Sequence, residues 1–283
     1  MSSGKLRELR GRIRSIISIQ QTTRAMRMIA AVKLRKAQEK LQHIRSYRQK
    51  AESLLDTLLR QLDEPHPYQS PPSAPKGLYV ILSSSRGLCG AFNSGLLRWL
   101  TPKLPPPQEA ELLILGKKAY EGLRRSSYKI QYHDLFGSKD ISTEAVQAQS
   151  RQIWEFFRKG EYRQIWLIYN RFGGVGRFIP TQELVLPLPT PAGEKDKRLW
   201  FHEPALPQLI EAFTPLYIET LLLTAVHESL TAEHSARMVA MQTATDNAEE
   251  LLRTLRLQYN KARQASITKE LLEIVAGAEA LKG

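Results

Sequence analysis

The stretch IRSIISIQQTTRAMRMIAAVKLRKAQ (residues 13–38) decides the fold class. It lies within a longer run, from Leu6 to Leu62, in which one set of positions recurs at alternating spacings of three and four residues. No proline interrupts this run, and Gly11 is its only interior glycine. A helix over the whole run is on the order of 85 Å long, at 1.5 Å per residue. No small domain can bury such a rod, so we expect it to pair with a second long helix.

The chain supplies that second helix at its other end, over residues 205–283. After Pro215 this segment has no proline, and it has no glycine before Gly277. Its predicted seam is rich in small residues, which lets two helix backbones approach closely; its members are Ile218, Leu221, Ala225, Ala232, Ala236, Val239, Thr243, Asp246, Glu250, Leu257, Gln264, Ile267, Leu271, Ile274 and Ala278. We therefore expect an antiparallel coiled coil made from the two chain ends.

The middle of the first seam differs from its ends, because it carries Gln20, Thr23, Arg27 and Ala30. These residues are polar or small, whereas leucine and isoleucine dominate on either side. The pattern predicts that the two helices pack most weakly, or approach most closely, at this point.

Between the rods, residues 77–204 carry the pattern of an α/β domain. Apolar runs predict strands at 77–84, 110–116, 128–133, 164–170 and 178–188, and helical patterns occur at 91–101, 117–127 and 141–159. Alternating strands and helices of this length indicate a Rossmann-like domain with a mainly parallel sheet. The proline-rich segment 63–76 reads as a linker. The predicted division is thus helix 1–62, linker 63–76, α/β domain 77–204 and helix 205–283.

The first strand runs into the glycine-rich stretch SSSRGLCGAFNSG (residues 83–95), which invites comparison with phosphate-binding loops. Its glycines at 87, 90 and 95 match neither the P-loop spacing nor the dinucleotide fingerprint, and no lysine follows Gly90. The stretch therefore predicts a tight turn into a helix, with Asn93 or Ser94 as the helix cap. A second glycine-rich stretch, YNRFGGVGRF (169–178), precedes a strand and predicts a hairpin or loop.

Candidate catalytic and metal-binding groups are few. Cys89 is the only cysteine, so no disulfide can form within the chain, and pairing it with His133 as a base is weaker than an inert buried thiol. His227 and His234 lie seven residues apart without a third ligand in sight, which favours two exposed polar positions. We expect no catalytic residue, no metal and no cofactor.

The charge is concentrated at the N-terminal end. The net charge is +13, and residues 1–60 hold 15 Lys and Arg against 4 Asp and Glu, an excess of +11. Such a surface seeks nucleic acid, anionic lipid or an acidic protein face. Tyr47 is the only aromatic residue in this segment, which disfavours base stacking but leaves phosphate contact open. No apolar run is expected to span a membrane, and the single cysteine suits a reducing compartment.

Four blocks together resemble one family, the gamma subunit of F-type ATP synthase: residues 13–38, SSRGLCGAFN (84–93), EHSARMVAMQTATDNAEELL (233–252) and LQYNKARQASITKELLEIVAGAEAL (257–281). The resemblance covers the whole chain in order. It implies a non-catalytic central shaft that couples proton flow through a membrane rotor ring to the catalytic beta subunits.

The resemblance also implies partners and contact residues. The partners are the alpha and beta subunits, with acidic loops of beta, the epsilon subunit and the ring of c subunits; neither nucleic acid nor a small-molecule ligand is implied. The implied rotor–stator contacts are Arg24, Met26, Arg237, Arg263, Gln264 and Thr268, and Glu203 is the implied contact to the rotor ring. The bacterial type would lie on the cytoplasmic face of the inner membrane.

Two alternatives of other classes stay open at this stage. One is a basic coiled-coil protein that binds nucleic acid through its N-terminal surface. The other is an α/β enzyme whose long helices serve only to oligomerise.

Overall fold

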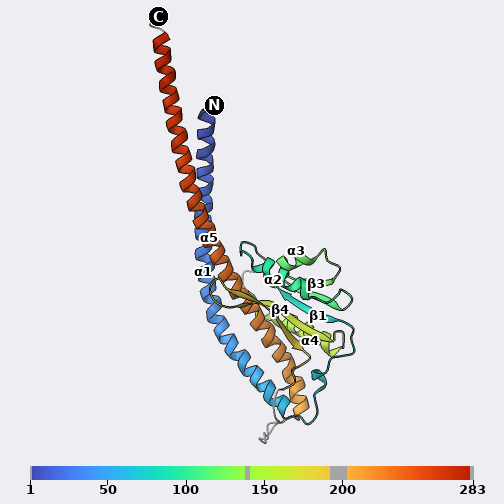
Figure 1. The fold of residues 1–283 in the computed structure, drawn as a ribbon. Helices are drawn as coiled ribbons and strands as arrows, with labels where there is room; N and C mark the ends of the chain where they lie inside the picture. The colour runs from blue at the N-terminus through green and yellow to red at the C-terminus, as the bar shows by residue number, and fades with distance from the viewer. Residues whose placement is uncertain (1, 138–140, 192–202, 281–283) are drawn as a thin grey trace. The chain divides into compact units, whose positions relative to one another are not determined.

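The computed structural model describes residues 2–137, 141–191 and 203–280, and these form two compact units. The coil unit comprises residues 1–30 and 238–283, and the head unit comprises residues 31–237. Helix α1 (Ser2–Arg60) and helix α5 (Leu206–Ala280) each contribute to both units. The two rods predicted from the heptad pattern are therefore confirmed as single long helices (Figure 1).

The head unit contains a five-stranded sheet of order β3-β2-β1-β4-β5. The strands are β1 (Gly77–Leu82), β2 (Ala110–Leu115), β3 (Lys129–His133), β4 (Gln164–Phe172) and β5 (Phe178–Leu186). Three of the four strand pairs are parallel, and only β5 runs antiparallel to its neighbour β4. The predicted Rossmann-like, mainly parallel sheet is confirmed, and each strand overlaps the run predicted for it.

Helices cover both faces of this sheet because successive side chains of a strand point to opposite faces. Leu78, Val80 and Leu82 of β1 face a core shared with α4 (Thr143–Arg158) and with the head-unit parts of α1 and α5. Tyr79 and Ile81 face a second core with α2 (Phe92–Leu100) and α3 (Lys117–Leu123). All six residues of β1 are buried, as expected for a central strand in an α/β layer.

Short elements complete the head unit. The proline-rich segment contains one 3₁₀ turn, η1 (Pro67–Gln69), and a second, η2 (Thr101–Lys103), follows α2. The stretch at 169–178 is the hairpin between β4 and β5, where Gly174 and Gly176 have φ values of 123° and 74° that favour glycine. The polar stretch PTPAGEKDK (189–197) follows β5, and residues 192–197 of it lie outside the described residues.

In the coil unit the two helices run antiparallel. Arg10 of α1 donates to the hydroxyl of Tyr259 of α5 over 2.7 Å, and Thr23 of α1 pairs with Thr245 of α5. Later residues of α1 therefore pair with earlier residues of α5. The buried positions on α1 include Leu9, Thr23 and Ala30, which the sequence placed in the seam.

On α5 the predicted seam is correct as far as Ala236 and wrong beyond it. Val239, Leu257 and Ile267 are 40%, 59% and 48% exposed. The buried positions instead follow a heptad two residues along, whose members are Met241, Thr245, Ala248, Leu252, Leu255 and Ser266. Both registers carry apolar residues, and the buried one includes threonine and serine, so counting apolar side chains favoured the wrong face.

One expectation about membranes also changes. Among the described helices, α5 contains an 18-residue window, with mean hydropathy 1.5, that is long and apolar enough to cross a membrane by length and composition alone. More than half of that window, 56%, is buried inside the protein. A core helix of a water-exposed protein has the same composition, and residues 206–226 of α5 are part of the main head core.

Candidate functional site

The loop after β1 is the first part of the candidate site, and its own side chains shape it. Leu88 and Gly90 have φ values of 62° and 57°, and Leu88 is exposed at the tip of the turn. The Ser83 hydroxyl accepts from the Ala119 amide over 2.9 Å and donates to the Gly116 carbonyl over 3.1 Å. The strand end is thereby tied to the start of α3.

Asn93 has a different role from the predicted one. The helix cap of α2 is Ala91, without a side-chain hydrogen bond, so the prediction of Asn93 or Ser94 as the cap is wrong. The Asn93 side chain instead reaches back across the loop, accepting from the Ser84 amide over 3.0 Å and donating to the Ser84 hydroxyl over 2.7 Å. The Asn93 side chain thus joins the two ends of the turn, nine positions apart.

The thiol of Cys89 lies under this bridge. It is 3% exposed and lies 3.3 Å from the Asn93 amide nitrogen. Burial raises the pKa of the Cys89 thiol, which keeps it protonated and poorly nucleophilic. Ser84 and Arg237 act in the opposite direction, but burial is the larger cause, so its surroundings are those of a packing residue.

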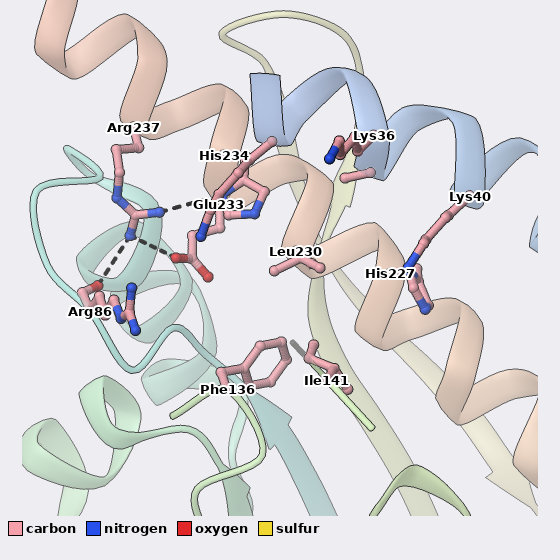
Figure 2. Close-up of a pocket in the computed structure, with 12 residues that line it drawn as sticks. Lys36, Lys40, Arg86, Phe136, Ile141, His227, Leu230, Glu233, His234 and Arg237 are labelled. Carbon is pink, nitrogen blue, oxygen red and sulfur yellow. Dashed lines mark hydrogen bonds and ion pairs between the residues drawn. The ribbon is translucent and has the colours of Figure 1, made fainter. Parts of the chain in front are cut away.

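Arg237 of α5 holds the same loop from the other side. Its guanidinium donates to the Gly87 carbonyl over 3.2 Å. It also forms an ion pair with Glu233 at 2.6 Å, which Figure 2 shows. The two side chains are 14% and 7% exposed. A residue predicted to touch the stator is thus engaged within the head unit, where it fixes the loop against α5.

The remaining predicted stator contacts lie in the coil unit. Arg24 on α1 is exposed, and Met26 is partly buried, consistent with a mixed role for that methionine. Arg263, Gln264 and Thr268 on α5 are all exposed. Within this unit, these side chains are available to another molecule, apart from part of Met26.

The sequence analysis missed a set of exposed apolar residues in the coil unit. On α1 these are Ile19, Met28 and Ile29; on α5 they are Leu271, Leu272, Ile274 and Val275, which are between 57% and 68% exposed. In Figure 1 the C-terminal end of α5 extends past the N-terminal end of α1. The signal was present in the sequence, because several of these residues lie off both heptad seams and would have no partner within a two-helix coil.

The two histidines of α5 are a further correction. His227 and His234 were predicted as exposed polar positions, but both are partly buried and line one pocket of the head unit (Figure 2). Burial, together with Arg237 and Lys33, lowers the pKa of His234 to about 4. Glu203, the predicted rotor-ring contact, is exposed and precedes α5. Among the described residues, no group of three His, Cys, Asp or Glu side chains could hold a metal ion.

Comparison with known proteins decides the family. The family model described as ATP synthase matches residues 5–281, which is nearly the whole chain. ATP synthase gamma chains match it from end to end: that of Heliobacterium modesticaldum is 35% identical, and the alignment covers 98% of this chain and 99% of that relative.

The chain belongs to the ATP synthase gamma-chain family.

Further relatives and solved structures agree. The gamma chain of Christiangramia forsetii is 38% identical over 98% of this chain and 99% of its own length. Among solved structures, a chain of the mitochondrial ATP synthase rotor of Euglena gracilis has a TM-score of 0.67 at 20% identity, covering 94% of this chain and 99% of that one. A second Euglena gracilis ATP synthase structure, of OSCP, F1 and c-ring, contains a chain with a TM-score of 0.71 at 21% identity, covering 99% and 95% of the two chains. At these identities the structures establish the shared fold.

Family membership makes the chain a non-catalytic subunit, the central shaft, of a membrane-associated multisubunit enzyme. The predicted family and shaft role are therefore confirmed, and the nucleic-acid alternative is without support. The loop at 83–95 and the buried Cys89 are parts of a subunit whose catalytic chemistry takes place elsewhere in the complex.

Proposed function

We propose that the coil unit is the part that turns inside a ring of alpha and beta subunits, and that its exposed end is the part those subunits surround. The observation that carries the proposal is the unpartnered apolar end of α5. Leu271, Leu272, Ile274 and Val275 are each more than half exposed, on a stretch that α1 does not cover. Such a cluster is costly in water and is typical of a surface that meets another protein.

The charge of the coil unit supports a partner with acidic loops. Arg24 and Arg263 are exposed and, among the described residues, neither forms an ion pair. Charge attraction acts over about 8 Å at physiological ionic strength. It favours approach without fixing one register. A rotating part needs that property, so acidic loops of the beta subunits are the proposed counterpart, with Met26, Gln264 and Thr268 as neighbouring contacts.

The head unit is proposed to contact the ring of c subunits and the epsilon subunit. Exposed Glu203 is the proposed contact to the ring of c subunits, and the epsilon subunit is proposed to lie beside the head. Arg237 fits a different role from the one expected: through Gly87 it presents the tip of the loop, and Leu88 at that tip is the exposed residue. We assign the stator contact at this point to the loop, and the support of the loop to Arg237.

The experiment is reconstitution of the full chain with alpha and beta subunits. We expect a stable complex with ATPase activity, and none from the chain alone. The variant Arg24→Gln with Arg263→Gln should lower turnover several-fold, since it removes two exposed charges from the proposed contact surface. The matched control is Arg125→Gln, an exposed arginine of the head unit, which should leave turnover unchanged.

Two results would contradict the proposal. Failure of the wild-type chain to co-purify with alpha and beta subunits would contradict the proposal that these subunits surround the coil unit. An equal loss of activity in Arg125→Gln and in the coil-unit variant shows that overall charge, not this surface, is responsible.

The same proposal includes the location of the chain in the cell and its division into working parts. We place it on the cytoplasmic face of a bacterial inner membrane, as a peripheral subunit. We also keep the division into 1–62, 63–76, 77–204 and 205–283 as the proposed arrangement of working parts, in which the two rods carry torque and the α/β domain meets the ring.

A further inference from the structure

The head unit contains a pocket that the shaft role does not use. It is a cavity of about 180 Å³ between α1, α5 and the loops after β1 and β3. Figure 2 shows side chains converging on it from these elements. Its volume lies below the roughly 300–1,000 Å³ of sites for drug-sized ligands, so it suits a compact molecule.

Positive charge dominates the wall of this pocket. Lys33, Lys36 and Lys40 line it from successive turns of α1, and Arg86 lines it from the loop after β1. Among the described residues, none of these four side chains forms an ion pair, whereas many arginines of the same unit do. Four cations that meet at one cavity without an ion pair of their own repel one another, and an anion would relieve that repulsion.

On the described part of the wall, Glu233 is the one carboxylate, and it faces more than one cation. It is 7% exposed and accepts a 2.6 Å bond from Arg237. Lys33 and Arg86 also act on it electrostatically, so one carboxylate cannot balance all the cations of the wall. The histidines add donors without adding charge: burial and Lys40 lower the pKa of His227, and its Nδ1 atom is buried with no hydrogen-bond partner among the described residues. An unpartnered ring nitrogen beside unpaired lysines is a group that a ligand can satisfy.

The floor of the pocket is apolar. Phe136, Ile141 and Leu230 line it opposite the lysines, as Figure 2 shows. An apolar floor lowers the local dielectric constant and strengthens the attraction between the wall and an anion. Lysine is a point-charge binder of phosphate, and arginine presents a fork of N–H donors to it.

We infer that this pocket binds a compact anion that carries two or more phosphate-type negative charges. The site adjoins the loop after β1, whose tip is a proposed stator contact, because Arg86 and Arg237 line the pocket. It departs from the expectation that the chain takes no small-molecule ligand. Because the pocket joins α1, α5 and the loop that Arg237 supports, an anion bound there bridges three elements of the head unit.

The test is calorimetric titration of the full-length chain with inorganic pyrophosphate in a buffer free of phosphate and sulfate. We expect saturable binding of one equivalent. Replacing Lys36 and Lys40 together by glutamine should weaken binding about tenfold or more, since two charge-assisted contacts are lost. The matched control is Lys50→Gln, an exposed lysine of the same helix outside the pocket, which should change the affinity less than about twofold.

A second variant has the opposite expected sign. Glu233→Gln removes the carboxylate that the described residues place on the wall while keeping a hydrogen-bond acceptor for Arg237, so it should tighten pyrophosphate binding. Circular dichroism checks that each variant folds. Absence of binding at millimolar pyrophosphate overturns the proposal and leaves these cations to an acidic segment of a partner subunit. A loss that Lys50→Gln reproduces also overturns it, because binding would then follow total charge.

Discussion

The head unit and the coil unit use apolar residues in opposite ways. In the head unit, Leu78, Val80 and Leu113 are completely buried, and helices cover both faces of the sheet. In the coil unit, the seam consists of leucine, alanine, threonine, methionine and serine residues that remain up to 9% exposed, and Ile274 outside the seam is 68% exposed. The head unit builds two sheet-centred cores, although single residues such as Leu88 and Val175 are exposed there, whereas the C-terminal end of the coil unit exposes several neighbouring apolar residues. The two units thus differ in whether most of their apolar residues form a core or remain at the surface.

The largest expected effect is a cavity in the head core. Leu113→Ala removes a completely buried side chain of β2, and we expect a loss of about 3–4 kcal/mol of unfolding free energy. All four tryptophans of the sequence, at 99, 154, 166 and 200, belong to the head unit, so urea unfolding followed by tryptophan fluorescence reports on this unit. A loss below about 1 kcal/mol would show that the core is loosely packed.

The next effect concerns an ion-pair network that joins α1 to the sheet. Arg48 bonds to both carboxylate oxygens of Glu183 and to Glu52 at 2.7 Å, and Tyr169 donates to Glu183 over 2.9 Å. Arg48→Ala leaves Glu183, which is 20% exposed, without its cation, and we expect a loss of about 3 kcal/mol in the same unfolding measurement. Arg35→Ala is the control, because its pair with Glu39 is exposed and should be worth less than about 0.5 kcal/mol. Similar losses in both variants would mean that burial does not matter here.

A smaller effect is expected at the polar layer of the coil unit. The hydroxyls of Thr23 and Thr245 lie 2.8 Å apart in the buried seam. Thr23→Val should cost about 1 kcal/mol, because it leaves the Thr245 hydroxyl with one partner fewer. The double variant with Thr245→Val should recover most of that loss. Hydrogen exchange of the α5 amides gives both values, and additive losses would show that the hydroxyls do not interact.

The smallest expected effect on stability concerns an exposed apolar residue of the coil unit. Leu271→Ala removes a side chain that is 57% exposed, so the free energy of unfolding should change by less than about 0.5 kcal/mol. Assembly with alpha and beta subunits should nevertheless weaken, which co-purification at decreasing concentration measures. A marked loss of stability in the isolated chain would place this residue in an internal contact instead.

The sequence predicted most of the fold because its strongest signals are long and periodic. Apolar runs bounded by glycine and proline predicted the five strands and the three helices between them. Long periodic segments without proline predicted the two long helices. The seam of α5 beyond Ala236 could not be read, since Leu257 and Ile267 on one face compete with Leu252 and Leu255 on the other. Only the position of α1 decides between the two faces.

The candidate site was less predictable, because its contacts join residues far apart in the chain. Nothing near Arg237 in sequence indicates that its guanidinium meets Gly87, 150 positions away. His227 and His234 share a helix face, but their burial depends on the loops after β1 and β3. Such contacts follow from how the chain folds back on itself, and periodicity within one helix does not contain them.

The two edge strands of the sheet, β3 and β5, affect whether the chain aggregates before it is assembled into its complex. Edge strands expose unpaired backbone groups that can recruit another chain and begin aggregation. Here β3 has only five residues and starts with Lys129, and β5 contains Pro180, which has no amide hydrogen to donate. Both edges therefore resist edge-to-edge growth. We therefore expect that a newly synthesised chain does not aggregate through its sheet edges before the exposed apolar end of α5 binds a partner.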